Sequence, residues 1–521
     1  MPSVEIFDYI VIGSGFGGSV SAMRLTEKGY KVLVLEQGKR FRESDFPKSD
    51  WNFSKYLWLP ALGFRGIMKL SFFKPVFILS GTGVGGGSLV YAATLLRPPD
   101  DFFEHSCWPR NINWKVVLDP FYTKAETMLG VSHFSDFGIE DNLLKEVADE
   151  MGAGQTFAGV DTGIYFGDGN TETDPYFDGK GPLRKACTGC AGCMTGCREG
   201  AKNTLDKNYL YFAEKNGAEV AELTKAYKIE YSNSTYTVHT KSVKFPHRKS
   251  IYRSKGLIVS CSVLGTLELL LRQKSVLKTL PKLSPTLGTR VRTNSESLSG
   301  VVNSPFKLNN GPAITSMFHP ETGTSIQLVK FNDASGGVTH LAGFATDGNK
   351  PIKRFLNFTA YFITHPLKVL RVFFRFRWCK NSVVVMVMQM NNSSLAITLR
   401  KTLLGARPKF RQSLVNIPSY IPKGQEFLRL FAAKTRSTPM NCITELLFNK
   451  ATTAHIIGGC PMGDSAETGV VNPLLEVHNY PGMYVIDSSI VPGNLGVNPS
   501  LTIAALAEYA MEHIPENYNS H

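Results

Sequence analysis

Runs of apolar residues separated by a glycine-rich turn organise the beginning of the chain. Residues 7–12 are apolar at all but one position and rich in β-branched side chains, so they predict a buried strand. After the turn, apolar residues follow at helical spacing, namely Val20, Met23 and Leu25. A second apolar run, 31–35, predicts another strand. The order strand, turn, helix, strand is typical of an α/β domain.

The same kind of pattern returns later in the chain. Residues 257–260 predict a buried strand, and a helical pattern begins at Gly265. Residues 383–388 form a further apolar run bounded by asparagines and predict a strand. Residues 481–487 predict a turn and a strand that ends in an acid, and a helix follows over 501–507. We expect segments from both ends of the chain to join one dinucleotide fold.

The turn after the first strand carries the three glycines of a dinucleotide-binding motif. Gly13 allows a tight turn, Gly15 lets the backbone approach a pyrophosphate, and Gly18 lets the helix pack closely on the strand. The helix N-terminus offers free N–H groups to phosphates. Glu36 ends the second strand, where a carboxylate meets ribose hydroxyls. Glycine-rich turns in other α/β proteins can imitate the glycines, but the complete arrangement predicts a dinucleotide site, with FAD and NAD both open.

A second glycine-rich segment, residues 80–88, must lie against a flat surface or adopt positive φ angles. Its candidate cofactor-binding residues are Gly83, Gly85, Gly86, Gly87 and Ser88. A mobile surface loop is the alternative. Because an apolar run, 89–91, follows at once, we expect an anchored loop that covers the cofactor.

Composition and charge narrow the class of protein. The 521 residues are 43% apolar and 19% charged, which is typical of a globular chain with two or more domains. The net charge of +14 indicates a partner with negative charge. The excess lies beside aromatic residues at about 48–80 and 350–380, which favours a lipid surface over nucleic acid. No signal peptide and no run of about 18 apolar residues is visible, so we expect a cytoplasmic protein, soluble or peripherally membrane-associated.

One stretch alternates long cations with large apolar groups. Its members are Lys353, Arg354, Phe355, Phe358, Tyr361, Phe362, Lys368, Arg371, Phe373, Phe374, Arg375, Phe376, Arg377 and Trp378. At a lipid interface the rings would insert and the cations would lie near phosphates. Alternatively, the aromatic rings line a substrate pocket or the core, with the arginines on the solvated side. The sequence leaves both interpretations open.

Four of the nine cysteines lie within eleven residues, and the odd total suits a reduced compartment better than a disulfide framework. Cys187, Cys190, Cys193 and Cys197 have the spacing of iron–sulfur ligands in bacterial ferredoxins and are the candidate metal ligands. Arg198 stands where a proline usually follows. A structural zinc site and unliganded packing thiols are the alternatives. A cluster beside a flavin would allow single electrons to pass to a carrier.

Several segments together resemble a known enzyme family. They are the N-terminal glycine motif, 83–91, 455–460 and 496–502. In this order they look like the glucose-methanol-choline (GMC) oxidoreductases and, within them, the cholesterol oxidase-like branch. The resemblance covers about half of the chain and is weak through 270–450. It implies an FAD enzyme that oxidises a hydroxyl group.

The resemblance also implies roles for three residues near the C-terminus. In the family, the histidine and asparagine that match His455 and Asn498 face the flavin at the substrate hydroxyl, and the acid that matches Asp487 binds the cofactor. A packed or surface histidine and a turn-capping acid are the alternatives. Tyr91 departs from the asparagine of cholesterol oxidases. Because no counterpart of their acidic base can be assigned, double-bond isomerisation stays undecided.

We therefore expect an α/β fold in which a Rossmann-like FAD-binding domain is interleaved with a substrate-binding domain built on a mostly antiparallel sheet. The FAD-binding domain takes residues 1–40, 80–130, 185–275 and 450–521. The substrate-binding domain takes 41–79, 131–184 and 276–449, with the cysteine-rich segment 187–197 at the boundary.

The expected function is oxidation of a hydroxyl on a sterol or similarly large hydrophobic alcohol, by hydride transfer to FAD. A flavin and iron–sulfur dehydrogenase that passes electrons from another hydrophobic alcohol to a carrier is one alternative. A non-catalytic flavoprotein or lipid-surface binding module is the other. Nucleic acid is not expected as a partner, since the cations lie among aliphatic as well as aromatic residues.

Overall fold

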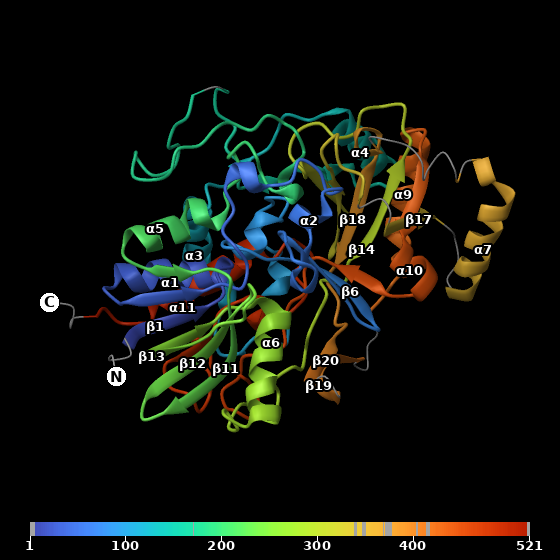
Figure 1. The fold of residues 1–521 in the computed structure, drawn as a ribbon. Coiled ribbons are helices and arrows are strands. Elements are labelled where there is room, and N and C mark those ends of the chain that lie inside the picture. Colours follow the sequence, from blue (N-terminus) through green and yellow to red (C-terminus); the bar gives the residue numbers. More distant parts are fainter. Residues whose placement is uncertain are drawn as a thin grey trace.

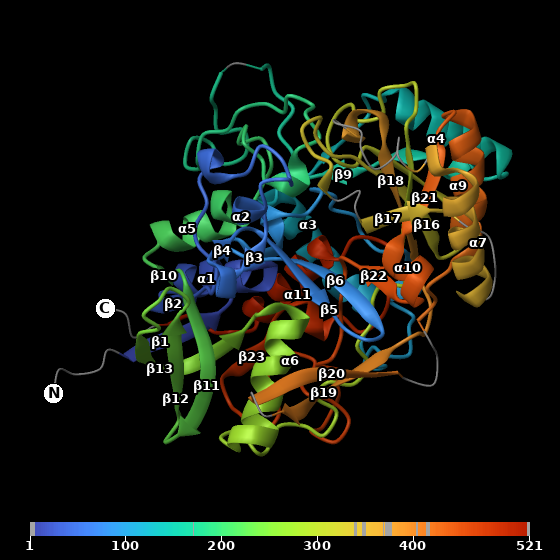
Figure 2. The same cartoon turned by 45° about the vertical axis from the view of Figure 1, so that its right-hand side comes forward.

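Two seven-stranded sheets, each covered by helices, organise the chain in the computed structural model (Figure 1). Both described ends of the chain lie on the side of the first sheet (Figures 1 and 2). The fold is α/β, as the sequence predicts. The structure describes residues 6–169, 171–337, 341–345, 351–367, 369, 378–402, 405–412 and 417–517.

The first sheet contains the strands of the predicted dinucleotide fold. β1 lies between β2 and β13 and is parallel to both, and β13 is also parallel to β23 from the C-terminal part of the chain. β12 and β11 continue the sheet in antiparallel pairs. The strands are β1 (Ile6–Ile12), β2 (Val32–Leu35), β10 (Glu219–Ala221), β11 (Thr224–Ser232), β12 (Thr235–Ser242), β13 (Lys249–Val259) and β23 (Met483–Val485). Segments from both ends of the chain therefore build one sheet.

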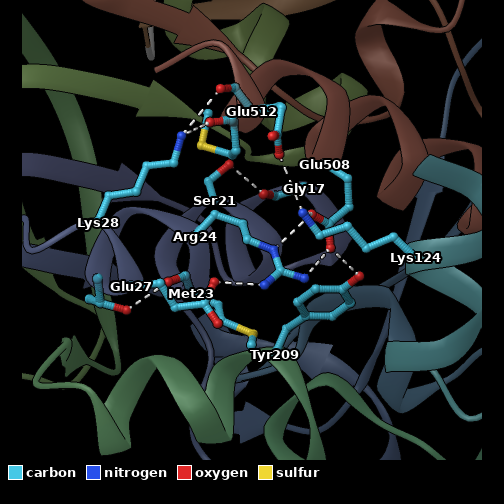
Figure 3. Close-up of polar contacts among 12 residues, drawn as sticks. Gly17, Ser21, Met23, Arg24, Glu27, Lys28, Lys124, Tyr209, Glu508 and Glu512 are labelled. Atoms are coloured by element: carbon cyan, nitrogen blue, oxygen red, sulfur yellow. Dashed lines mark hydrogen bonds and ion pairs between the residues drawn. The ribbon is translucent and has the colours of Figure 1, made fainter. Parts of the chain in front are cut away.

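Helices from both ends of the chain also pack against each other beside this sheet. α1 (Phe16–Glu27) lies against α11 (Ser500–Glu512). The side chain of Glu508 is fully buried and accepts hydrogen bonds from Nε and Nη2 of Arg24, each at 2.8 Å (Figure 3). Such a bidentate, charge-assisted pair is strong and directional. It fixes the C-terminal helix on the first helix of the nucleotide fold.

Two further helices meet the same buried carboxylate. The hydroxyl of Tyr209, in α5 (Tyr209–Lys215), donates to Oε1 of Glu508 at 2.7 Å. Lys124, in α3 (Trp114–Met128), lies 3.4 Å from Oε2 of Glu508. Figure 3 shows these side chains converging from separate helices. Four helices far apart in sequence are thus held together around one acid.

The second sheet is antiparallel along its whole order, as expected for the substrate side. Its strands, from one edge to the other, are β17 (Ala342–Phe344), β21 (Thr438–Cys442), β14 (Ser297–Val302), β18 (Val383–Gln389), β16 (Thr324–Val329), β15 (Ser316–Glu321) and β8 (Ala158–Gly159). α4 (Ile139–Glu150) and α9 (Pro422–Lys434) cover one face.

Side chains of β18 alternate between the two faces of this sheet. Val385 and Val387 pack with the apolar side chains of α4 and α9. Met386 and Met388 belong to a separate cluster on the other face. This alternation is the ordinary pleat of a strand. The strand predicted over 383–388 is present, and its second face lies toward the interior of the molecule.

The remaining elements connect or flank the two sheets. Smaller sheets are formed by β5 (Met68–Phe72) with β6 (Val76–Gly81) and β22 (Ala451–Thr453), by β3 (Trp58–Leu59) with β4 (Phe64–Arg65), by β7 (Ser132–His133) with β9 (Asp161–Thr162), and by β19 (Leu395–Thr402) with β20 (Gly405–Gln412). The other α-helices in the described ranges are α2 (Phe53–Tyr56), α6 (Ser262–Arg272), α7 (Pro351–Thr364) and α10 (Ile443–Phe448). Among the helices that the structure describes, none has the length and apolar character of a membrane-spanning segment.

Candidate active site

A cavity of about 920 Å³ lies between the two sheets. Its size is at the upper end of the range for small-molecule and cofactor sites, roughly 300–1,000 Å³. Both glycine-rich segments, the start of α6 and the chain around 454–456, 487–488 and 498–500 contribute to its wall. Of the predicted site residues, those on the wall are Gly13, Gly15, Glu36, Gly86, Gly87, His455, Asp487 and Asn498.

The first glycine motif has the shape that a bound dinucleotide requires. A Cβ added at Gly15 would meet no atom within 4 Å, so this glycine borders open space at the N-terminus of α1. A Cβ at Gly18 would lie 2.0 Å from the carbonyl oxygen of Gly13. Gly18 therefore serves the close packing of helix on strand, whereas Gly15 leaves room for phosphate at the uncapped helix N-terminus.

The two glycine-rich segments touch each other. A Cβ at Gly86 would lie 2.6 Å from Cα of Gly15, so only a glycine fits there. Ser14 joins the segments as well, because its hydroxyl accepts from the backbone N–H of Gly85 at 3.1 Å and lies 3.3 Å from the carbonyl oxygen of Gly83. Ser88 is fully buried and holds the turn by donating to the Gly85 carbonyl at 2.7 Å. Gly83, Gly85 and Ser88 are not on the cavity wall, and they fix the conformation of the loop whose Gly86 and Gly87 line it.

Glu36 is buried at the edge of the cavity. It accepts hydrogen bonds from the hydroxyl of Ser14 at 2.8 Å and from the backbone N–H of Gly38 at 2.7 Å. Burial raises the pKa of this carboxyl above its usual value, and the hydrogen bonds oppose that rise. The acid is held in one orientation at the end of β2, where the ribose of a dinucleotide would lie.

Asp487 caps a short helix and lies on the cavity wall. Its carboxylate accepts from the backbone N–H of Ser489 at 2.7 Å, so it caps the short helix Ser488–Ile490. It also accepts from the hydroxyl of Thr266 at 2.5 Å and lies on the cavity wall. Burial raises the pKa of the Asp487 carboxyl. The acid is therefore both a structural cap and available to a cofactor.

His455 and Asn498 lie together on the cavity wall. Nδ2 of Asn498 is 3.3 Å from Nε2 of His455. On its other side the imidazole is bonded through Nδ1 to Oε1 of Glu296, a carboxylate whose side chain has no exposed surface. Glu296 also accepts from the backbone N–H of Ala454 at 2.7 Å. With Nδ1 donating to the carboxylate, Nε2 is the nitrogen that can accept a proton in the cavity.

A fourth side chain extends this row. Nε2 of the buried Gln327 donates to Oδ1 of Asn498 at 3.3 Å. The carboxamide of Asn498 is therefore oriented with its N–H group toward His455. The sequence interpretation missed Glu296, Gln327 and Ser14. A local signal exists for Ser14, which lies inside the glycine motif, but none exists for the other two, which lie where the family resemblance is weak.

The part of the cavity beyond this row is apolar. Met386 of β18 and Val329 of β16 face it from the second sheet, and their sheet neighbours Val385 and Leu328 face the covering helices instead. The other apolar side chains at this end include Ile314, Phe331, Leu341 and Met194. Such a wall excludes water and suits a large hydrophobic substrate.

The prediction of a metal site at the four cysteines is not supported. Within the ranges that the structure describes, no three His, Cys, Asp or Glu side chains are grouped so as to hold a metal ion. Cys190 is exposed, whereas Cys187, Cys193 and Cys197 pack in an apolar cluster. Burial raises the pKa of the Cys187 thiol to about 11 and that of Cys193 to about 12. The apolar surroundings of these three side chains suit packing thiols.

The residues present fit FAD. Open space at the Gly15 end of α1, an oriented acid at the end of β2 and a second glycine loop in contact with the first form a cradle for a dinucleotide. The cavity continues from this cradle to the row of His455 and Asn498 and on to the apolar end. A flavin ring and an apolar alcohol can therefore occupy one continuous space.

Comparisons with known proteins agree with this arrangement. Domain families described as GMC oxidoreductase match residues 183–281 and 390–507, and an NAD(P)-binding Rossmann-like domain matches 11–42. A cholesterol oxidase of Acinetobacter baumannii is 40% identical, over 98% of this chain and 95% of its own. One of Mycobacterium tuberculosis (strain ATCC 25618 / H37Rv) is 41% identical, over 97% and 90%. The crystal structure of pyridoxine 4-oxidase from Mesorbium loti aligns with a TM-score of 0.63 at 14% identity, covering 97% of this chain and 99% of that one, and shows a shared fold.

Proposed function

This chain belongs to the GMC oxidoreductase family, in its cholesterol oxidase-like branch, and from that premise we propose that it oxidises a hydroxyl group on a sterol or a similarly large hydrophobic alcohol. It is an FAD-dependent oxidoreductase that acts on CH–OH groups. The proposal concerns the substrate class and the residues that act on it.

One observation carries the proposal. The polar row of His455 and Asn498 stands where the glycine-lined part of the cavity meets its apolar end. A substrate whose bulk fills the apolar end would present its hydroxyl to this row, and a small polar alcohol would leave that end unfilled. The chain is 40% identical to a cholesterol oxidase and matches 95% of the length of that protein, which supports a sterol as the substrate.

The residues divide the work as follows. Nε2 of His455 accepts the proton of the substrate hydroxyl as the C=O bond forms, and Glu296 stabilises the positive charge that this proton brings. The carboxamide of Asn498 holds the substrate oxygen beside the imidazole. The apolar wall keeps water from the reacting carbon. FAD, when bound, supplies the acceptor for the hydride that leaves the carbon.

The substrate class also bears on where the protein works. A sterol is dissolved in lipid rather than in water, so the proposed function includes a peripheral encounter with a membrane surface. All nine cysteines are free, which suits the reduced cytoplasm. We infer oxygen as the final electron acceptor, because the relatives at 40% and 41% identity are oxidases.

Anaerobic bleaching of the flavin tests the substrate class. The holoenzyme is mixed with a panel of sterols and long-chain primary alcohols, and the matching sterol ketones serve as controls. We expect sterols to bleach the flavin fastest and the ketones to leave it oxidised. Readmission of air should then restore the absorbance. Bleaching by long-chain alcohols alone would replace the sterol assignment, and failure of air to restore the flavin would replace oxygen by another acceptor.

A further inference from the structure

α7 exposes a row of apolar side chains on its outer side. Ile352, Leu356 and Ile363 are 75%, 60% and 75% exposed, and Phe355 is about half exposed. At helical spacing these positions lie on neighbouring turns of one side of the helix. Figures 1 and 2 show α7 at the edge of the molecule, away from the first sheet. An apolar face of this kind on a soluble surface indicates a binding site.

The inner side of α7 is apolar as well and is already occupied. The ring of Phe344 in β17 lies 4.6 Å from that of Tyr361 and 5.9 Å from that of Phe362. Phe358 packs against Phe362, and a Cβ at Gly343 would lie 2.9 Å from the Phe358 ring. Rotation of the helix therefore cannot hide the outer residues, because it would expose these rings instead. The outer face needs a partner from outside this fold.

The charge around α7 selects the kind of partner. From residue 348 to residue 425 the sequence holds fourteen lysines and arginines and no aspartate or glutamate. Lys353 is exposed on α7 itself, next to Phe355. Arg354 is buried and donates to Oδ1 of Asn449. The remaining cations of the predicted aromatic and cationic stretch, Lys368, Arg371, Arg375 and Arg377, lie outside the described residues. A second copy of the chain would bring like charge to the contact, whereas an anionic lipid surface would be attracted.

The wall of the cavity includes an exposed aromatic side chain. Phe53 lines the cavity and is 46% exposed, and its ring lies 6.1 Å from that of Trp51, which is exposed to a similar degree. Leu341 also lines the cavity, and the next residue begins β17, on which α7 packs. The exposed ring of Phe53 thus stands at the rim of the cavity, and Leu341 joins the cavity wall to the strand on which α7 packs. Aromatic rings at such a rim are the side chains that prefer a lipid interface.

We propose that α7 is an interfacial helix that docks the enzyme on an anionic bilayer. Ile352, Phe355, Leu356 and Ile363 insert among the acyl chains near the headgroups, and Lys353 lies against lipid phosphates. The docking surface is argued from α7 alone and does not depend on which alcohol is oxidised.

Vesicle flotation of the FAD-loaded enzyme tests the docking surface. The variant is Leu356→Ser with Ile363→Ser, and the matched control is Phe245→Ser, an 88% exposed ring in the turn between β12 and β13, on the opposite side of the molecule. Wild type and control should float with phosphatidylcholine vesicles that contain phosphatidylglycerol. The variant should partition at least about tenfold less, because two inserted side chains are lost. Salt and omission of phosphatidylglycerol should each weaken the binding of wild type.

Activity on the same alcohol separates docking from catalysis. With detergent-dispersed substrate, all three proteins should turn over equally, and with vesicle-embedded substrate only the variant should be slow. The proposal is overturned if the variant floats like wild type, if wild type does not float at low salt, or if wild type sediments as a dimer that the variant abolishes. Flotation measures vesicle binding and not oxidation. An enzyme that binds vesicles but oxidises no sterol would therefore overturn the substrate assignment and leave the docking surface intact.

Discussion

Nδ1 of His455 is hydrogen-bonded to Oε1 of Glu296, a buried acid that comes 159 residues earlier in the chain. The second oxygen of Glu296 accepts from the backbone N–H of Ala454, so the carboxylate holds both the ring and the segment that carries it. Glu296 does not line the cavity, and it acts through His455. It is therefore a positioning residue rather than a catalytic one.

Replacing Glu296 by Gln tests this role. The amide keeps the size of the side chain and one of its two acceptor oxygens, so the fold is kept, but one hydrogen bond and the charge that stabilises the protonated imidazole are lost. We expect kcat to fall about 10- to 100-fold with little change in KM, because the loss is felt as the proton moves. Steady-state kinetics measure both constants. Glu321→Gln, at an exposed acid at the end of β15, should behave as wild type, and partial recovery in Glu296→Asp would support the role of charge.

Gly15 and Gly18 of the first motif should respond differently to the same added methyl group. Gly15→Ala meets no atom within 4 Å, so the chain should fold with an unchanged melting temperature but bind FAD at least about tenfold more weakly. Gly18→Ala places a Cβ 2.0 Å from the Gly13 carbonyl and should lower the stability by about 1–3 kcal/mol or more. Flavin content and thermal unfolding of both variants check the pair. Equal flavin loss without unfolding in both would contradict the assignment.

Short-range features could be predicted from the sequence, and long-range ones could not. Gly18 packs against Gly13, five residues away, so the spacing of the motif predicts this contact. A Cβ at Gly13 would lie 2.1 Å from the carbonyl oxygen of Ser260, in a distant part of the chain that the motif does not reveal. The strands β1 and β18 appear where the apolar runs predict them. The pairing of Glu296 with His455 depends on how β14 and β22 come together in the folded chain, and no local pattern encodes it.

The aromatic and cationic stretch shows a different limit. Its sequence fits both a lipid interface and a buried aromatic cluster, and in the described part, α7, the rings of Tyr361 and Phe362 are packed inward while Ile352 and Leu356 point outward. A helix has room for both sets of contacts on opposite faces. The sequence could not separate them because aromatic and aliphatic residues occupy both sides.

Glu445 should make stability depend on pH. This carboxyl is buried, accepts from the hydroxyl of Ser297 and the N–H of Leu298, and has a pKa raised by burial to about 8. An unfolded glutamate has a pKa of 4.5, so between these values the unfolded chain binds fewer protons and stability falls as pH rises. The side chain of Glu445→Gln cannot ionise, so this fall in stability with rising pH should disappear.

The matching measurement is the melting temperature across that pH window. Near pH 4.5 the variant and wild type should unfold alike, and at pH 8 the variant should be more stable, by at least about 2 °C. Glu426→Gln, at a half-exposed acid of α9, should show no such growing difference. A difference between Glu445→Gln and wild type that is the same at both pH values would contradict the buried, protonated state.

The cysteine cluster should bind no iron. After anaerobic purification, we expect iron and acid-labile sulfide far below one per chain, since buried thiols of raised pKa are poor ligands. Cys193→Ser should cost about 1–3 kcal/mol, because a hydroxyl replaces a thiol in an apolar cluster. Cys190→Ser, at the exposed position, should have no effect. Stoichiometric iron and sulfide that are lost in Cys190→Ser would restore the iron–sulfur prediction.

In the proposed reaction, His455 takes the proton of a substrate hydroxyl beside a flavin that is bound between two distant parts of the chain. The most direct measurement is the rate of anaerobic flavin reduction when a sterol is mixed rapidly with the FAD-loaded enzyme, for wild type and His455→Ala at equal flavin content. We expect the flavin of His455→Ala to be reduced about 10²- to 10⁴-fold more slowly, because a general base is lost. An unchanged rate, or a wild-type protein that cannot be reconstituted with FAD, would contradict it.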